Sequence, residues 1–237
     1  MLNENAIIKK PITNTLILIA LIWPAITTAS VVRMETILGD INIELYDSAA
    51  PLTVSNFMNY VNDGDYSNSI IHRSEPGFVI QGGGFTFDDS TGNPGAFVAL
   101  PQDAPIVNEY GIPNTRGTIA MARLHSSPDS ATSQWFINLV DNTEVLGSSN
   151  SGGYAVFGQV LGNGMDIVDA IAGLPTWGAY GVSPSIPVVD FSPFIGFQYD
   201  DLVIVNSISV VPIPIPAAIW LFGSGLVGLI GFSRRRK

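Results

Sequence analysis

The chain has 237 residues, of which 20 are acidic and 10 basic, so its formal net charge is −10 at pH 7. It contains no cysteine, which excludes disulfide bonds, cysteine nucleophiles and thiolate metal sites. Its two histidines cannot by themselves build a zinc site, so the sequence predicts no bound metal.

The N-terminal segment has the pattern of a secretory signal peptide. Lys9 and Lys10 precede a short apolar run at 16–23, and small residues follow at 27–29. A basic patch, an apolar run and small residues in this order are typical of exported proteins. We therefore predict a signal peptide over residues 1–30, cleaved near Ala29, with an uncleaved anchor as the alternative.

Residues 31–210 are predicted to form one domain with a strongly acidic surface. They hold nineteen acidic side chains and four arginines, a formal balance of −15. Such a surface repels nucleic acid and anionic headgroups, so we expect no nucleic-acid partner. An ordinary soluble acidic domain is the simpler interpretation, and an adaptation to salt is the alternative.

Short strands dominate the predicted elements. Residues 31–38 and 41–46 alternate between apolar and polar around Gly39-Asp40, which indicates a β-hairpin. We read 86–105 as a long surface loop, because it is rich in Gly, Asp, Ser and Pro, and we assign no role to 175–200 beyond wrapping the outside. Further strands are expected to flank Pro76-Gly77 and at 117–122, 134–139, 154–160 and 202–210.

Two helices are predicted within the domain. The first has Asp47 or Ser48 as its N-cap, Pro51 in its first turn and Gly64 at its end. The second covers 165–171. Many short strands with two helices favour a mainly β fold built on a closed antiparallel barrel.

The segment from Ile70 to Phe85 is the most informative in the chain. It places Arg73 among alternating apolar residues, continues through Pro76-Gly77, and ends in three glycines. An arginine on a mostly apolar strand surface indicates a functional role, and an ion pair with Glu75 is the structural alternative.

Four blocks of sequence, in order, resemble the bacterial branch of the cyclophilin family of peptidyl-prolyl cis-trans isomerases. The first has the family's His-Arg, Pro-Gly-Phe and Gln-Gly-Gly elements. The resemblance extends over residues 31–211 and implies eight strands with a helix over each open end of the barrel. The blocks are His72–Gly83, Asn114–Arg123, Ser130–Asn138 and Gly153–Gly158.

The resemblance also assigns roles to residues. It implies that Arg73 and Gln134 are catalytic and that no cofactor is needed. Ordinary core packing is the alternative for the apolar members, and a buried amide for the glutamines. The implied substrate-binding residues are Phe78, Val79, Gln81, Met121, Ala122, Arg123, Phe136, Leu146 and Tyr154.

The sequence departs from the family pattern at three places. Val79 stands where many relatives have methionine, and Arg123 stands where asparagine is frequent. Residues 142–146 lack the aromatic residue that relatives place on the pocket rim, so Glu144, Val145 or Leu146 must substitute for it.

Cis-trans isomerisation of an X-Pro peptide bond needs no nucleophile, metal or proton transfer. Resonance blocks rotation about a peptide bond with a barrier of about 18–20 kcal/mol. A fixed donor aimed at the prolyl nitrogen would weaken that resonance, while an apolar pocket holds the proline ring. By the resemblance, Arg73 is this donor.

The C-terminal residues 211–237 are predicted to form a sorting signal. Proline alternates through 211–216, an uncharged apolar stretch covers 217–232, and Arg234–Lys237 close the chain. This indicates a transmembrane helix with a basic stop, a buried core helix being the alternative. The tail also resembles the PEP-CTERM sorting signal, although its eponymous tripeptide is absent. That resemblance implies an exosortase-type processing enzyme and the periplasmic or cell-surface side of a Gram-negative envelope.

Two functional hypotheses follow. The first is an exported, membrane-anchored isomerase that acts on proline-containing polypeptides. The second is a module that binds such polypeptides in the same groove, as a chaperone or matrix component, without much catalysis.

Overall fold

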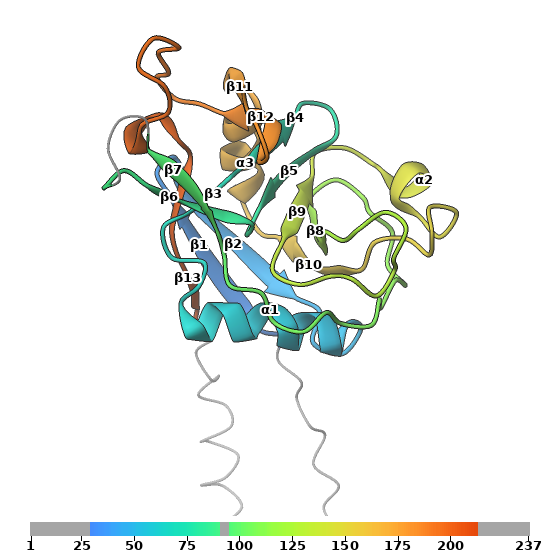
Figure 1. The fold of residues 1–237 in the computed structure, drawn as a ribbon. Coiled ribbons are helices and arrows are strands. Elements are labelled where there is room, and N and C mark those ends of the chain that lie inside the picture. The colour runs from blue at the N-terminus through green and yellow to red at the C-terminus, as the bar shows by residue number, and fades with distance from the viewer. Residues whose placement is uncertain (1–28, 91–94, 213–237) are drawn as a thin grey trace, which may run out of the picture.

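The computed structural model describes residues 29–90 and 95–212, and these form a mainly β structure (Figure 1). Eleven strands join in one antiparallel sheet, in the order β4-β5-β9-β8-β10-β2-β1-β13-β3-β6-β7, and β11 pairs with β12 in a separate sheet. The strands are β1 Val31–Thr36, β2 Gly39–Leu45, β3 Ser69–Ile70, β4 Arg73–Glu75, β5 Val79–Gly82, β6 Phe85–Asp88, β7 Ala96–Ala99, β8 Thr118–Met121, β9 Trp135–Asn138, β10 Val156–Val160, β11 Thr176–Ala179, β12 Ser183–Pro187 and β13 Ile204–Val210. The helices are α1 Pro51–Asp63, α2 Thr143–Leu146 and α3 Gly164–Ala172, with a 3-10 turn at Tyr199–Asp201.

The predicted first hairpin is present, with its turn two residues earlier than expected. The chain turns at Ile37 and Leu38, and Gly39, at φ 136°, already belongs to β2. Thr36 decides this position, because its hydroxyl donates to the Gly39 carbonyl at 2.7 Å and accepts from the Leu38 N–H at 3.2 Å. Alternate residues of both strands are buried, as the apolar-polar alternation predicts.

The two longer helices lie at opposite ends of the strands, α1 at the bottom of Figure 1 and α3 near the top. Helix α1 buries Val54, Phe57 and Tyr60 against the sheet. The Phe57 ring lies 5.1 Å from that of Phe157 and 5.3 Å from that of Tyr66, so aromatic packing fixes the helix to the core.

The expected N-cap of α1 is wrong. The N-cap residue is Ala50, which has no capping side chain, and Asp47 instead accepts from the Ser30 N–H. The Glu109 carboxylate, 56 residues away from Thr53, caps the helix. It accepts from the N–H groups of Leu52 and Thr53 at 3.1 and 2.7 Å and from the Thr53 hydroxyl at 2.7 Å.

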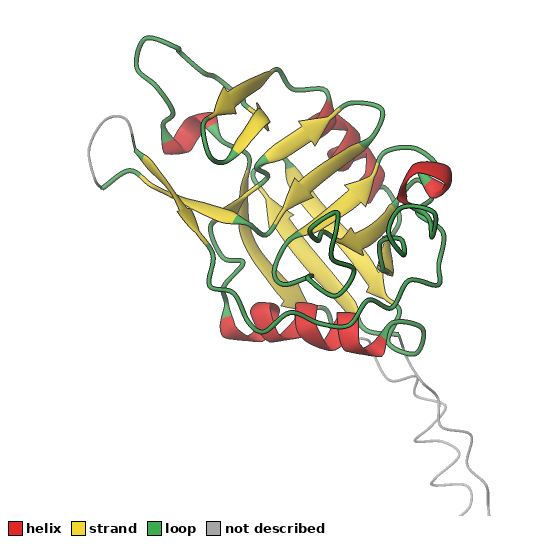
Figure 2. Ribbon diagram, turned by 45° about the vertical axis from the view of Figure 1, so that its right-hand side comes forward, coloured by secondary structure: helices red, strands yellow, loops and turns green. Residues whose placement is uncertain are grey.

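The main sheet has eleven strands among the described residues, where the resemblance implies eight, and its strand order ends at β4 and β7. Part of the segment predicted as a loop, 86–105, forms the β6–β7 hairpin, which extends away from the body (Figure 2). The unassigned segment 175–200 contains the β11–β12 hairpin, which lies beside β4. The other predicted strands and the second helix are confirmed.

Within residues 29–90 and 95–212, no helix is long and apolar enough to cross a membrane. The predicted signal peptide and the predicted C-terminal transmembrane helix lie outside the described residues.

Replacing Glu109 with alanine tests the long-range cap. We expect Glu109→Ala to lower the free energy of unfolding by about 1 kcal/mol, the usual cost of losing an N-cap. Urea unfolding measures this change. The matched control is Asp63→Ala in the last turn of the same helix, where removing an acidic group should cost nothing. Equal destabilisation by both variants would contradict the capping role.

Candidate active site

The register of three neighbouring strands places the site residues on one face. Arg73 of β4 lies opposite Gln81 of β5, and Gln81 lies opposite Phe136 of β9. Side chains of directly opposite residues point to the same side of a sheet. The turn between β4 and β5 contains Gly77 at φ 78°, a left-handed conformation that glycine adopts without strain.

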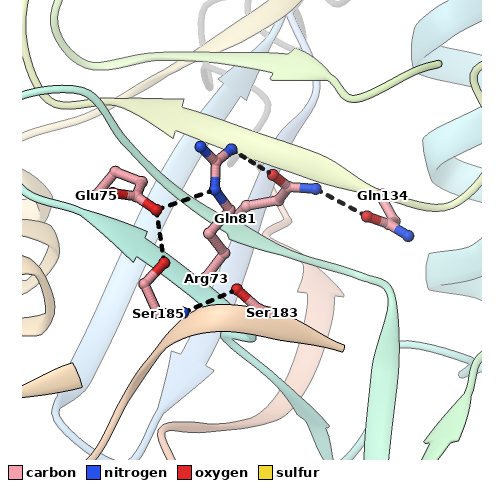
Figure 3. A network of polar contacts seen from close by, with 6 residues as sticks. All are labelled: Arg73, Glu75, Gln81, Gln134, Ser183 and Ser185. Carbon is pink, nitrogen blue, oxygen red and sulfur yellow. Dashed lines mark hydrogen bonds and ion pairs between the residues drawn. The ribbon is translucent and has the colours of Figure 1, made fainter. Parts of the chain in front are cut away.

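A chain of polar contacts fixes the Arg73 side chain (Figure 3). Its Nη1 donates to Gln81 Oε1 at 3.2 Å, and Gln81 Nε2 donates to Gln134 Oε1 at 2.8 Å. On the other side, Arg73 Nε lies 3.5 Å from Glu75 Oε1, so the ion pair considered from the sequence is present. The Ser185 hydroxyl of β12 donates to the same Glu75 oxygen at 2.6 Å. The guanidinium is therefore held from two sides.

The guanidinium borders a hollow of about 300 Å³ whose wall combines an apolar cluster with polar side chains. Val79, Phe136 and Leu146 are almost fully buried in one cluster, and Phe78 and Tyr154 pack against it. The Phe136 and Tyr154 rings meet edge to face at 5.7 Å. The lining residues are Arg73, Phe78, Val79, Gln81, Ala122, Arg123, Phe136, Val145, Leu146, Asn150 and Tyr154.

A larger hollow, of about 440 Å³, lies beside Tyr46 and Ile112. No basic or amide side chain lines it, so it lacks the groups that the predicted chemistry requires. We therefore place the candidate site at the smaller hollow.

The structure brings together most of the residues singled out from the sequence. Gln134 lies just outside the hollow, where it contacts Gln81 and lines an adjoining hollow with Ala122 and Arg123. Met121 does not belong to the pocket. Its side chain is 1 % exposed and packs in the main core, because it alternates with Ala120 and Ala122 along the strand. A substrate contact by that side chain is therefore not supported.

Sequence reasoning missed two residues of the site. Asn150 lines the hollow, and Ser185 reaches Glu75 from a segment to which no role was assigned. Val145, one of the three residues considered for the rim, also lines the hollow. The register of 142–146 is now clear. Leu146 belongs to the buried pocket cluster, whereas Val145, which also lines the hollow, is 59 % exposed. Nothing in the local sequence pattern signals the contact with Ser185.

His72 lies behind the site as a buried packing residue. Its ring meets Phe85 edge to face at 5.2 Å. Burial lowers the pKa of His72 to about 4, opposed by the Gln134 side chain and assisted by the charge of Arg73. The imidazole is therefore neutral at pH 7, which agrees with a structural role rather than an acid-base role.

The family model described as cyclophilin type peptidyl-prolyl cis-trans isomerase/CLD matches residues 31–192. The chain belongs to the cyclophilin family of peptidyl-prolyl cis-trans isomerases. The described residues thus include a cyclophilin domain, with the mainly β fold and few helices of that family.

Bacterial relatives support the same assignment. A peptidyl-prolyl cis-trans isomerase of Acinetobacter baylyi is 49 % identical over 160 residues, covering 67 % of this chain and 79 % of the relative. Peptidyl-prolyl cis-trans isomerase B of Escherichia coli is 46 % identical over 164 residues, covering 67 % and 93 %. A crystal structure of a Cryptosporidium parvum cyclophilin-type isomerase, obtained in the presence of the dipeptide Ala-Pro, has a TM-score of 0.56 at 24 % identity. It covers 77 % of this chain and 99 % of the other, and shows the shared fold alone.

The buried histidine makes stability depend on pH. The pKa of His72 is lower in the folded protein than the value near 6.5 of an unfolded histidine, so the unfolded state takes up the proton first. Stability therefore falls as the pH drops from about 6.5 to about 4, by up to about 3 kcal/mol from this group. Urea unfolding at several pH values should show a shallower loss for His72→Gln than for the parent. His125→Gln, at an exposed position, should keep the parent's slope. Identical slopes in all three proteins would contradict the assignment.

Proposed function

We propose that this cyclophilin accelerates the isomerisation of X-Pro bonds in exported or cell-surface proteins. One observation carries the proposal: a fixed guanidinium lines the same hollow as the apolar side chains of Phe78, Phe136 and Leu146. The hollow holds the proline ring by burying its apolar surface. Arg73 donates a hydrogen bond to the prolyl nitrogen of the X-Pro peptide bond that rotates.

The geometry assigns separate tasks to the nitrogens of Arg73. Nη1 donates to Gln81 and Nε faces Glu75, whereas Nη2 makes no hydrogen bond to any described residue. Nη2 is therefore free to donate to the prolyl nitrogen as that nitrogen becomes pyramidal and gains a lone pair. This donation stabilises the twisted state more than the planar one, which is the condition for catalysis. Arg73 has already lost much of its rotamer freedom, so substrate binding need not order it.

Binding without much turnover remains the second candidate. It is favoured by the rim of the hollow, where Val145 is 59 % exposed and the segment 142–146 contains no aromatic residue. A less enclosed rim would hold a proline segment while restraining its rotation less. In this case Arg73 would contribute to affinity alone.

We further propose that the protein is exported and held, at least transiently, at a membrane on the periplasmic or cell-surface side of a Gram-negative envelope. Residues 1–30 would act as the signal peptide, and residues 211–237 as a sorting signal read by an exosortase-type enzyme. The Val211 N–H donates to the Val31 carbonyl at 2.8 Å, so both ends of the described domain lie side by side. A membrane attached at this side leaves the domain projecting into the medium.

Replacing Arg73 tests the catalytic proposal. We expect Arg73→Ala to lower kcat/KM for a short Xaa-Pro peptide by roughly 100-fold to 1,000-fold, as for loss of one donor to a developing charge. Arg73→Lys should recover little, because a lysine cannot bond Gln81, Glu75 and the prolyl nitrogen in one plane. The control is Arg33→Ala, which removes an exposed arginine paired with Asp40. NMR exchange spectroscopy measures the rates.

Two results would contradict the proposal. Equal acceleration by the parent and Arg73→Ala would remove Arg73 from the mechanism. Tight binding of the peptide by a folded parent that does not accelerate isomerisation would favour the binding module.

Cell fractionation tests the export proposal. In a Gram-negative host that carries an exosortase, we expect the full chain to lose its N-terminal segment and to appear outside the cytoplasm. Removal of Arg234–Lys237 should abolish processing of the tail, because the basic stop orients the apolar stretch. A cytoplasmic, unprocessed parent would overturn this proposal without affecting the isomerase activity.

A further inference from the structure

All the N–H groups of the Arg123 guanidinium donate hydrogen bonds to backbone carbonyls of the protein itself. Its Nε donates to the Gly153 carbonyl at 3.0 Å. Nη1 donates to the carbonyls of Leu124 and His125, both at 3.0 Å, and Nη2 to those of Asn150 and Ser151 at 2.9 and 3.1 Å. A guanidinium has five N–H groups, so none remains for a substrate.

The loop that receives these bonds, 147–153, has a costly backbone conformation. Three consecutive residues, Ser151, Gly152 and Gly153, have φ values of 48°, 90° and 76°. The left-handed region costs a non-glycine residue roughly 1–2 kcal/mol, so Ser151 needs compensation from its surroundings. Hydrogen bonds from a charged donor are the stronger kind, and Arg123 supplies three of them to this loop.

The same loop is bonded to the wall of the proline pocket. Asn150 Nδ2 donates to the Val145 carbonyl at 2.8 Å, and the Tyr154 N–H donates to the Leu146 carbonyl at 3.1 Å. The Arg123 guanidinium also lies over the Tyr154 ring, with Cζ 4.2 Å from its centre. Displacement of the loop would therefore move both Leu146 and Tyr154.

We propose that Arg123 is a positioning residue that holds the 147–153 loop, Leu146 and Tyr154 as one rigid wall of the pocket. Arg123 stabilises this side of the pocket, where the segment 142–146 has no aromatic side chain. Its role is thus to build the binding surface, in place of the substrate contact expected from the sequence. The inference rests on the isomerase function proposed for this pocket.

The consequence for kinetics is specific. Without the hydrogen bonds of Arg123, only a fraction of the molecules has Leu146 and Tyr154 in the binding position. The apparent affinity for the substrate is then reduced by that fraction. Saturating substrate selects the competent molecules, so kcat is conserved. For the full-length protein, we expect Arg123→Lys to raise KM about tenfold and to change kcat less than about twofold, because an ammonium cannot bridge five carbonyls.

Amide hydrogen exchange without substrate gives a second readout. The amides of Gly152, Gly153 and Tyr154 are bonded inside the loop and to Leu146, and they should exchange faster in Arg123→Lys. The matched control is Arg116→Lys, whose parent side chain bonds the Leu139 carbonyl and Asp169 away from the hollow. It should change neither KM nor the exchange of these amides.

Asn108→Ala covers the case in which Arg123→Lys fails to fold. Asn108 Nδ2 bonds the carbonyls of Gly152 and Gly153, both at 3.1 Å, from outside the pocket. Removing this side chain should speed hydrogen exchange at the amides of Gly152, Gly153 and Tyr154 and raise KM about twofold to threefold.

Unchanged exchange and KM in the folded Arg123→Lys protein would overturn the proposal. So would a fall in kcat at constant KM, which would place Arg123 on the rotating bond. If the parent itself does not turn over, the isomerase function fails, and the exchange of the loop amides still decides whether Arg123 is a clamp.

Discussion

The pairing of β4 with β5 decides where the positive charge of the site stands. It sets Arg73 opposite Gln81, and one hydrogen bond of 3.2 Å then helps to fix the guanidinium at the wall of the hollow. If the register slipped by one residue, Arg73 would face the opposite side of the sheet, toward the core. Catalysis by a fixed donor requires that the donor be oriented before the substrate arrives, and the strand register supplies this orientation.

Two long-range contacts complete the site around this pair. Ser185, on the β11–β12 hairpin, holds Glu75 beside Arg73. Arg123 fixes the loop that carries the opposite wall. These contacts fix the charged side chains of Glu75 and Arg123 near the pocket, and neither side chain takes part in the proposed reaction. The site thus combines one donor, an apolar cluster at the wall of the hollow, and contacts from distant segments that hold both in place.

The domain carries many more acidic than basic side chains, and its two ends lie next to each other. Surface charge of one sign keeps the molecule dispersed and disfavours nucleic acid and anionic lipid as partners. Since Val31 and Val211 are hydrogen-bonded neighbours, a signal at each end of the chain would act from the same side of the domain.

The sequence by itself determined the elements whose cause is local. Apolar alternation predicts β1 and β2, Pro51 and Gly64 mark the ends of α1, and Pro76-Gly77 predicts the turn that presents Arg73. Only the tertiary structure decided the contacts between distant segments. Glu109 caps α1, Ser185 bonds Glu75, and Arg123 bonds the carbonyls of Asn150, Ser151 and Gly153. Periodicity reports which face of an element is apolar, but it does not report which carboxylate or carbonyl the rest of the chain will bring to that element. Those partners are set by packing across 27 to 110 residues of sequence, and no local pattern encodes them.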